Sequence, residues 1–120
     1  LLIYNNISVI DLGTSDNNSV DYPDYAKKVS NRVKSGKSDM GILVCGSGIG
    51  MAISANKTKG IRAAVCYNLR STRLSRQHNN ANIISLGARL TSKKIAFKLV
   101  STFLKTKFEG GRHLRRVKKI

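Results

Sequence analysis

One short stretch constrains the fold of this chain more than any other: an unbroken apolar run that leads directly into a glycine-rich loop. The run is Met40–Cys45, and the loop Gly46–Gly50 carries three glycines at alternate positions. An unbroken apolar strand is typical of a parallel sheet that helices cover on both faces. Alternating glycines let the backbone turn tightly and approach a ligand closely. The stretch therefore predicts a buried strand, a tight loop, and a ligand site where the strand ends.

The rest of the chain alternates between short apolar runs and segments with helical spacing. Further strands are predicted at Ile7–Ile10, Ile61–Cys66 and Ile83–Leu86. A first helix is predicted from a cap at Asp21, with Pro23 in its first turn and Tyr25, Val29 and Val33 on one face. Two further helices are predicted over Met51–Lys57 and over Leu69–His78. A long helix is predicted from a cap at Thr91, with a core face of Ile95, Leu99, Val100 and Phe103. Leu1–Tyr4 is typical of the last turn of a helix, which Asn5 and Asn6 can end. A loop is predicted at Gly13–Ser19, and a basic tail that is helical at Gly110–Ile120. This order predicts a single α/β domain over residues 1–120 with a parallel sheet.

The composition excludes several classes of protein. Hydrophobic residues make up 41% of the 120 residues and charged residues 23%, which are values of a globular chain and not of a disordered one. The apolar runs are far shorter than the roughly 20 residues of a transmembrane helix, and no signal-peptide pattern is expected at the start. Two cysteines do not make a disulfide framework. A cytoplasmic location with both thiols free is therefore expected.

The charge of the chain is strongly positive. Twenty-two Lys and Arg against six acidic residues give a net charge of +16, which attracts phosphates, nucleic acid or acidic membrane. Three interpretations stay open: drift in composition, phosphate binding by a few arginines, and a nucleic-acid surface. The aromatic content of 6%, without Trp, offers little for stacking against bases and argues against the last of these.

The glycine loop departs from the common nucleotide-binding patterns. A dinucleotide fingerprint would need a third glycine at position 51, which is Met51, and an acidic residue about 20 positions further on. A phosphate-binding P-loop would end in Gly-Lys-Ser/Thr, which is also missing. The loop amides nevertheless converge as an anion site, for a group that is negative or becomes negative during a reaction.

Two cysteines end predicted strands, and the segments after them differ. Cys45 is followed by the glycine loop and a helix, and a thiol near the N-terminus of a helix is favoured as a thiolate. Two interpretations of Cys45 stay open: a base or nucleophile, and an inert buried thiol. Cys66 has no glycine loop after it and is expected to fill the core.

Polar residues later in the chain add candidates for acid–base chemistry and phosphate binding. His78 lies in a polar run between elements and is either an acid–base group or a solvated side chain. Arg112 and Arg116 are four residues apart, so on a helix they share one face and can hold a phosphate, or belong to a solvated tail. Arg89 follows a strand end and is ambiguous by itself.

Four motifs at compatible spacing make the chain resemble a known enzyme family. They are Asp21-Tyr22-Pro23, Cys45-Gly46-Ser47-Gly48-Ile49-Gly50, Ser75-Arg76-Gln77-His78-Asn79 and Glu109-Gly110-Gly111-Arg112-His113. Together they closely resemble the ribose-5-phosphate isomerase B family, which includes the galactose-6-phosphate isomerase subunits. The resemblance implies a Rossmann-like three-layer α/β/α fold and an enzyme of the pentose phosphate pathway that interconverts ribose 5-phosphate and ribulose 5-phosphate. It also implies no metal or organic cofactor, and a homodimer with its active site at the subunit interface, with a dimer of dimers left open.

The resemblance also assigns roles to particular residues. Cys45 matches the family's catalytic base and His78 its ring-opening acid. The loop Gly46, Ser47, Gly48, Ile49 and Gly50 matches its sugar- and anion-binding loop. Ser47, which stands where many members have Thr, is also expected among the catalytic residues. Asn79 and Arg89 match ligand contacts across the dimer interface, Arg112 and Arg116 match phosphate and substrate contacts, and Tyr22 belongs to a matching substrate-binding motif.

One departure from the family and two alternatives accompany this interpretation. The family begins with a strand that ends in a substrate-contacting Asp-His pair, followed by a helix, whereas this chain starts near the end of that helix. Impaired stability and activity of the 120-residue chain are therefore expected, because buried strands would lack a neighbour. The alternatives are a galactose-6-phosphate isomerase subunit or non-catalytic sugar-phosphate binder, and, less favoured, a nucleic-acid binder.

Overall fold

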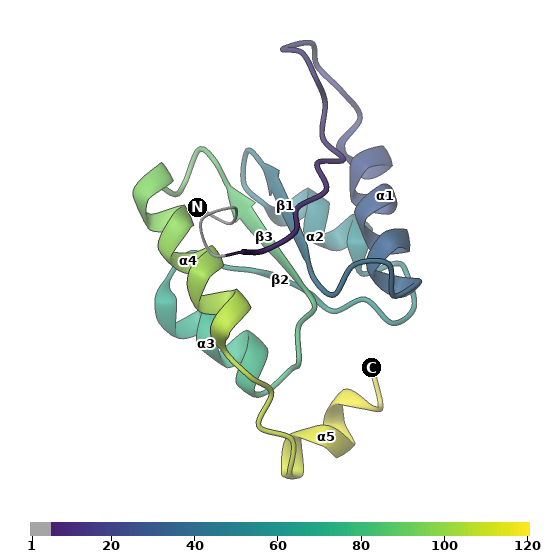
Figure 1. The fold of residues 1–120 in the computed structure, drawn as a ribbon, viewed down its shortest axis with the longest axis vertical. Helices are drawn as coiled ribbons and strands as arrows, with labels where there is room; N and C mark the ends of the chain where they lie inside the picture. The colour runs from purple at the N-terminus through teal and green to yellow at the C-terminus, as the bar shows by residue number, and fades with distance from the viewer. Residues whose placement is uncertain (1–5) are drawn as a thin grey trace.

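Strand β3 (Ile83–Gly87) lies at the centre of a parallel sheet, between β1 (Gly41–Cys45) and β2 (Ala63–Val65). The structure is a computed structural model that describes residues 6–120 (Figure 1). Its helices are α1 (Tyr22–Lys34), α2 (Ile49–Ala55), α3 (Leu69–Gln77), α4 (Lys93–Lys105) and α5 (Arg112–Val117). All residues of β3 are buried, as expected for the central strand of a covered sheet.

Helices cover both faces of the sheet, and successive residues of β3 point to opposite faces. Ile83 packs with residues of α1 and α2, including Ala26 and Met51, in one hydrophobic cluster. Ile84 packs with residues of α4, including Leu99 and Phe103, in the other cluster. In Figure 1 the strands lie between α3 and α4 on one side and α1 and α2 on the other. The arrangement is the Rossmann-like α/β/α fold expected from the sequence.

Most of the predicted elements are confirmed, with small shifts of their bounds. The three strands of the sheet lie within or beside the predicted apolar runs, and the helices begin or end within a few residues of the predicted positions. The basic tail does form a helix, α5. Asn6 has a φ of 58°, the left-handed conformation expected of a helix-ending Asn, whereas the helical turn predicted at Leu1–Tyr4 lies outside the described residues.

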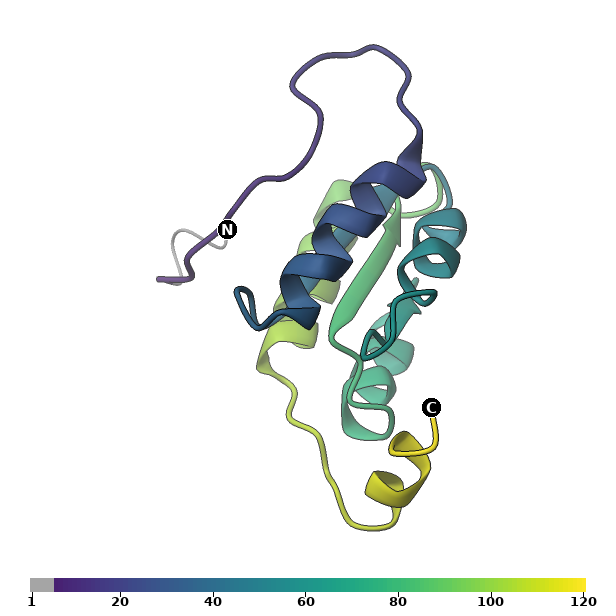
Figure 2. The same ribbon diagram turned by 90° about the vertical axis from the view of Figure 1, so that its right-hand side faces the viewer.

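The predicted strand at Ile7–Ile10 is wrong. This segment has no strand conformation, and the side chains of Ile7, Val9 and Ile10 are 37%, 48% and 54% exposed. Figure 2 shows the segment running apart from the sheet and its helices. Extended backbone is stabilised by pairing and by packing of a face, and within residues 6–120 β1 pairs only with β3. An apolar run without a paired neighbour therefore does not become a strand.

Two details of helix α4 also differ from the prediction. The cap is Ser92 and not Thr91, because the Ser92 hydroxyl accepts a hydrogen bond from the Ile95 amide at 3.3 Å. Thr91 instead belongs to the turn after β3, where its amide donates to the Gly87 carbonyl. Ile95 was expected in the core but is 40% exposed, since it lies in the first turn at the end of the sheet.

Helix α1 begins as predicted, although its cap works through the backbone. Asp21 occupies the cap position and Pro23 the first turn, but the Asp21 side chain makes no capping hydrogen bond. Its carbonyl accepts a hydrogen bond from the Asp24 amide at 3.1 Å instead.

Over the described part of the chain, none of the helices combines the length and apolar character needed to cross a bilayer.

Candidate active site

The sulfur of Cys45 faces the glycine loop, as the sequence predicts. Cys45 is half-buried at the last position of β1, and the Gly48 amide donates a hydrogen bond of 3.2 Å to its Sγ. Gly48 has a φ of 81°, a left-handed conformation that suits glycine and folds the loop back over the sulfur. The local backbone therefore holds the sulfur against the loop.

The loop is held in place by the end of strand β3. Gly87 lies so close to Ser47 that a Cβ at position 87 would be 2.6 Å from the Ser47 carbonyl oxygen. The buried hydroxyl of Ser85 donates to the Gly48 carbonyl at 2.6 Å, and the Tyr67 hydroxyl donates to the Ser47 carbonyl at 2.8 Å. Ser85, Gly87 and Tyr67 were not among the site residues predicted from the sequence. A serine inside an apolar strand and a glycine at its end were the available signals.

Two amides of the loop remain available to a ligand. The N–H groups of Gly46 and Ser47 donate to no residue in the described part of the chain, whereas those of Gly48 and Ile49 donate to Cys45 and to the Ser47 hydroxyl. Unpaired N–H groups beside a half-buried sulfur can bind an oxygen that acquires negative charge. The binding of an anion by this loop stays a prediction from the sequence.

Tyr22 and Arg89 flank the same loop. A Cβ at Gly50 would lie 2.7 Å from ring atoms of Tyr22, so the ring packs directly against that glycine. The Arg89 side chain lies against Gly46, with its Nε 3.4 Å from the position a Cβ would take. The Arg89 amide also donates to the Gly46 carbonyl at 3.0 Å. Both predicted residues are thus brought to the loop of their own chain, and Arg89 adds a positive charge there.

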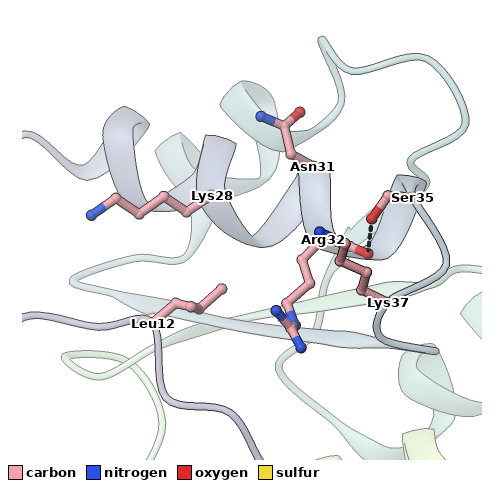
Figure 3. Close-up of a pocket in the computed structure, with 6 residues that line it drawn as sticks. All are labelled: Leu12, Lys28, Asn31, Arg32, Ser35 and Lys37. Carbon is pink, nitrogen blue, oxygen red and sulfur yellow. Dashed lines mark hydrogen bonds between the residues drawn. The ribbon is translucent and has the colours of Figure 1, made fainter.

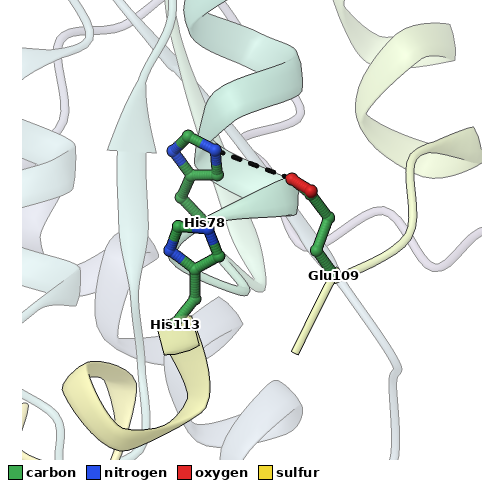
Figure 4. A group of neighbouring side chains, drawn as sticks. All are labelled: His78, Glu109 and His113. Carbon is green, nitrogen blue, oxygen red and sulfur yellow. Dashed lines mark ion pairs between the residues drawn. The ribbon is translucent and has the colours of Figure 1, made fainter. Parts of the chain in front are cut away.

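A second group of polar side chains lies where helix α3 ends, and it contains His78. His78 Nε2 is 3.6 Å from Glu109 Oε1, and the His78 ring stacks on the His113 ring at 4.2 Å between centroids. Figure 4 shows these side chains gathered between the end of α3 and the start of α5. In the sequence, Glu109 and His113 stand out only as part of a motif, and they are 30 or more positions from His78. Only the tertiary structure brings them together.

A buried arginine fixes the connection that carries Glu109. The Arg76 side chain is 8% exposed, and its Nε donates to the Thr106 carbonyl at 3.0 Å. Its Nη1 donates to Asn80 Oδ1 and to the Ala81 carbonyl. Burial, together with the charge of Arg62, lowers the pKa of Arg76 from its usual value. These bonds tie the segment after α4 to the end of α3.

The predicted site residues fall into two groups at opposite ends of the sheet. Cys45 pairs with Gly87 at the carboxyl end of β3, whereas His78 precedes the amino end of that strand at Ile83. Five residues of parallel strand span about 13 Å. Asn79 is exposed beside His78, and Arg112 and Arg116 are exposed on α5. Figures 1 and 2 both place α5 away from the carboxyl ends of β1 and β3.

A shallow basic pocket on helix α1 contains none of the predicted residues. It has a volume of about 400 Å³ (Figure 3). Its lining residues are Leu12, Lys28, Asn31, Arg32, Ser35 and Lys37. Arg32 Nε donates to the Ser38 hydroxyl at 2.9 Å, so the guanidinium is partly used within the chain. The pocket therefore does not extend the site around Cys45.

Comparison with known proteins shows that the chain is an isomerase of the α/β class. Residues 1–120 match the Ribose/Galactose Isomerase family, and the chain belongs to this family. The ribose-5-phosphate isomerase B of Escherichia coli is 44% identical over 99% of this chain and 80% of its own length. The structure of the Clostridium thermocellum ribose-5-phosphate isomerase B is 52% identical, with a TM-score of 0.97 over 98% of this chain and 80% of that one. The Mycoplasma genitalium enzyme, solved with bound ribulose 5-phosphate, is 42% identical, with a TM-score of 0.94 over 98% of this chain and 79% of that one.

Proposed function

We propose that the chain interconverts ribose 5-phosphate and ribulose 5-phosphate through a cis-enediolate, with Cys45 as the base. The observation that carries this proposal is the hydrogen bond from the Gly48 amide to the Cys45 sulfur, beside the amides of Gly46 and Ser47, which donate to no residue among 6–120. The family membership supports the substrate class. A relative with bound ribulose 5-phosphate supports the choice of a pentose phosphate.

In the proposed reaction one base moves a proton between neighbouring carbons. The Cys45 thiolate removes the C2 proton of open-chain ribose 5-phosphate, and the C2 electrons form a C1–C2 double bond as the carbonyl oxygen gains the charge. The amides of Gly46 and Ser47 stabilise that oxygen. The Cys45 thiol then returns its proton to C1, while the proton of the C2 hydroxyl passes to the charged C1 oxygen, which leaves a ketone at C2 and a hydroxyl at C1. A positioned base contributes about 10²–10⁴-fold to such a rate.

His78 and the arginines are proposed to prepare the substrate for this step. Ribose 5-phosphate is mostly a closed ring, and an acid at His78 protonates the ring oxygen so that the aldehyde forms. Arg112 and Arg116, on one face of α5, bind the phosphate, and Asn79 contacts the sugar. Phosphate binding far from the reacting carbons aligns them with the base.

The separation of Cys45 from His78 supports a site that two copies of the chain share. The two residues lie at opposite ends of β3 in one chain, yet the reaction needs both on one sugar. A homodimer with two-fold symmetry can place the His78 end of one copy beside the Cys45 loop of the other, twice over. We propose such a dimer, acting in the cytoplasm within the pentose phosphate pathway.

Complementation between two inactive variants tests the proposal. Cys45→Ala and His78→Ala, each without activity alone, should regain about a quarter of the wild-type rate when unfolded and refolded together, because half of the random dimers then carry one intact site. Two Cys45→Ala preparations refolded together are the control and stay inactive. A mixture without activity contradicts the shared site. Equal rates with galactose 6-phosphate would contradict the preference for pentose.

A further inference from the structure

Both histidines of the chain lie in one cluster with its last carboxylate. The chain has two histidines, and Glu109 is its only acidic residue beyond Asp39. One ring nitrogen of His78, one of His113 and one oxygen of Glu109 lie within 4.8 Å of one another (Figure 4). Two imidazoles and a carboxylate are ligands that bind zinc and its neighbours in the first transition row. The mechanism proposed above uses only one of the three.

The backbone holds two of these ligands in place. His78 caps α3, with its amide donating to the Leu74 carbonyl at 2.9 Å. The Glu109 amide donates to the Gln77 carbonyl at 3.1 Å, next to His78. The buried Arg76 ties the same connection to α3 at Thr106. His78 and Glu109 are therefore positioned relative to each other before any ion arrives, which reduces the entropy lost on binding.

The separation of His78 and Glu109 fits a tetrahedral ion, and the His113 side chain must turn to complete the site. Metal–ligand bonds near 2.1 Å in a tetrahedron place neighbouring ligand atoms about 3.4 Å apart. The His78 Nε2 to Glu109 Oε1 distance is 3.6 Å. The His113 ring is stacked on His78 with 14° between the planes, and it must turn out of this stack to aim a nitrogen at the ion. His113 is half-buried on α5, a helix without buried residues, so no closely packed core side chains oppose that rotation.

The surroundings select which ions can bind. Mg²⁺ and Ca²⁺ prefer a full set of oxygen ligands, and the cluster offers one carboxylate. Arg112 and Arg116 on α5 add positive charge beside His113, which disfavours any ion held by charge alone. Zn²⁺, Ni²⁺ and Cu²⁺ gain enough from imidazole ligands to bind here.

We propose that His78, Glu109 and His113 form a binding site for a late first-row divalent metal ion, with Zn²⁺ as the reference ion. The bound ion occupies the ring nitrogen of His78 and fixes α5 through His113. This inference rests on the proposed function for its consequence, which is inhibition: a metal-bound His78 nitrogen cannot protonate the ring oxygen of a sugar. The site itself depends only on the geometry of the three side chains.

Zinc titration of the full chain against a chromophoric chelator tests the site. One Zn²⁺ per chain should bind, and Glu109→Gln and His113→Gln should each weaken binding by more than about tenfold. Asp39→Asn, which removes a distant exposed carboxylate, and Cys45→Ala, which removes the competing thiol, should bind like the wild type. Zinc binding that survives both cluster variants, or that Cys45→Ala abolishes, overturns the site. Competition by Mg²⁺ at the same concentration overturns the proposed selectivity.

Two further measurements test metal binding separately from the inhibition that it is proposed to cause. Because the chain has two histidines, proton NMR shows both imidazoles as separate signals, and Zn²⁺ should shift the two together. Zn²⁺ should also slow isomerisation of ribose 5-phosphate by the wild type and leave the Glu109→Gln rate at its own metal-free value. Shifted imidazole signals with an unchanged wild-type rate contradict the acid role of His78 and keep the site. Unshifted signals overturn the site and leave the proposed function standing.

Discussion

The Gly48 amide donates its hydrogen bond to the sulfur of Cys45 at 3.2 Å, three residues back along the chain. This contact forms because the left-handed Gly48 turns the loop over the end of β1. It leaves the preceding amides of Gly46 and Ser47 without acceptors in the described part of the chain. A potential base and two donors for a developing oxyanion therefore lie within one short loop.

Removal of the Cys45 sulfur should stop the proton transfer without emptying the site. Cys45→Ala is expected to lower turnover by at least about 10²-fold, the usual contribution of a positioned base, while phosphate-ligand binding stays close to the wild type. Exchange of the C2 proton with deuterated solvent, followed by NMR, measures the step directly. Cys66→Ala is the matched control, since that thiol is buried away from the loop, and it should keep turnover. Undiminished exchange in Cys45→Ala would rule this residue out as the base.

The two thiols should differ in reactivity with pH. Burial raises the pKa of the Cys66 thiol above its usual value, although hydrogen bonds with Thr72 and Ser75 lower it in part. A raised pKa in the folded state stabilises the fold below the unfolded-state value of about 8.5, and this contribution is lost as the pH rises through the folded-state pKa. Iodoacetamide at pH 8 should therefore label Cys45 well before Cys66, as mass spectrometry of the peptides can show. Equal labelling rates at pH 8 contradict this, and unfolding in urea should equalise them.

A methyl group at Gly87 should displace the loop. In Gly87→Ala the new Cβ would lie 2.6 Å from the Ser47 carbonyl oxygen, a contact with backbone that no side-chain rotation relieves. Because a shift of about 1 Å in a catalytic group can cost about 10²-fold in rate, kcat/KM should fall by about that factor. Gly13→Ala is the control, since its Cβ meets only the flexible Asp11 side chain at 3.1 Å. The prediction fails if both variants retain wild-type kcat/KM.

Neighbouring arginines on α5 allow a matched test of phosphate binding. Arg116→Gln should raise KM for ribose 5-phosphate by about 10- to 100-fold, since a hydrogen bond to a charged group contributes about 1.5–3 kcal/mol. Arg115→Gln removes the same charge from the adjacent position, on a different face of the helix, and should leave KM nearly unchanged. Initial rates over a range of substrate concentrations at constant ionic strength separate the two. Equal effects would indicate general attraction by the basic helix rather than a specific contact.

The sequence was a good guide wherever local pattern and burial agree. The apolar run before Cys45 and the glycines after it predict both the strand and a loop turned toward the sulfur, and both are confirmed. It was a poor guide at Ile7–Ile10, where apolar character alone predicts a strand that the structure lacks. A strand depends on a partner, which no local pattern supplies. The choice of Ser92 over Thr91 as the cap depends on the turn after β3, which uses the Thr91 amide.

The chemistry of each end of the sheet was thus determined by sequence, because residue type and spacing decide what a loop or a helix face can bind. The separation of the two groups of site residues was decided only by the tertiary structure. Parallel strands run in one direction, so a residue that ends one strand, such as Cys45, and a residue that precedes another strand, such as His78, lie at opposite ends of the sheet. The meeting of His78, Glu109 and His113 likewise depends on long-range folding, in which the buried Arg76 holds distant segments together.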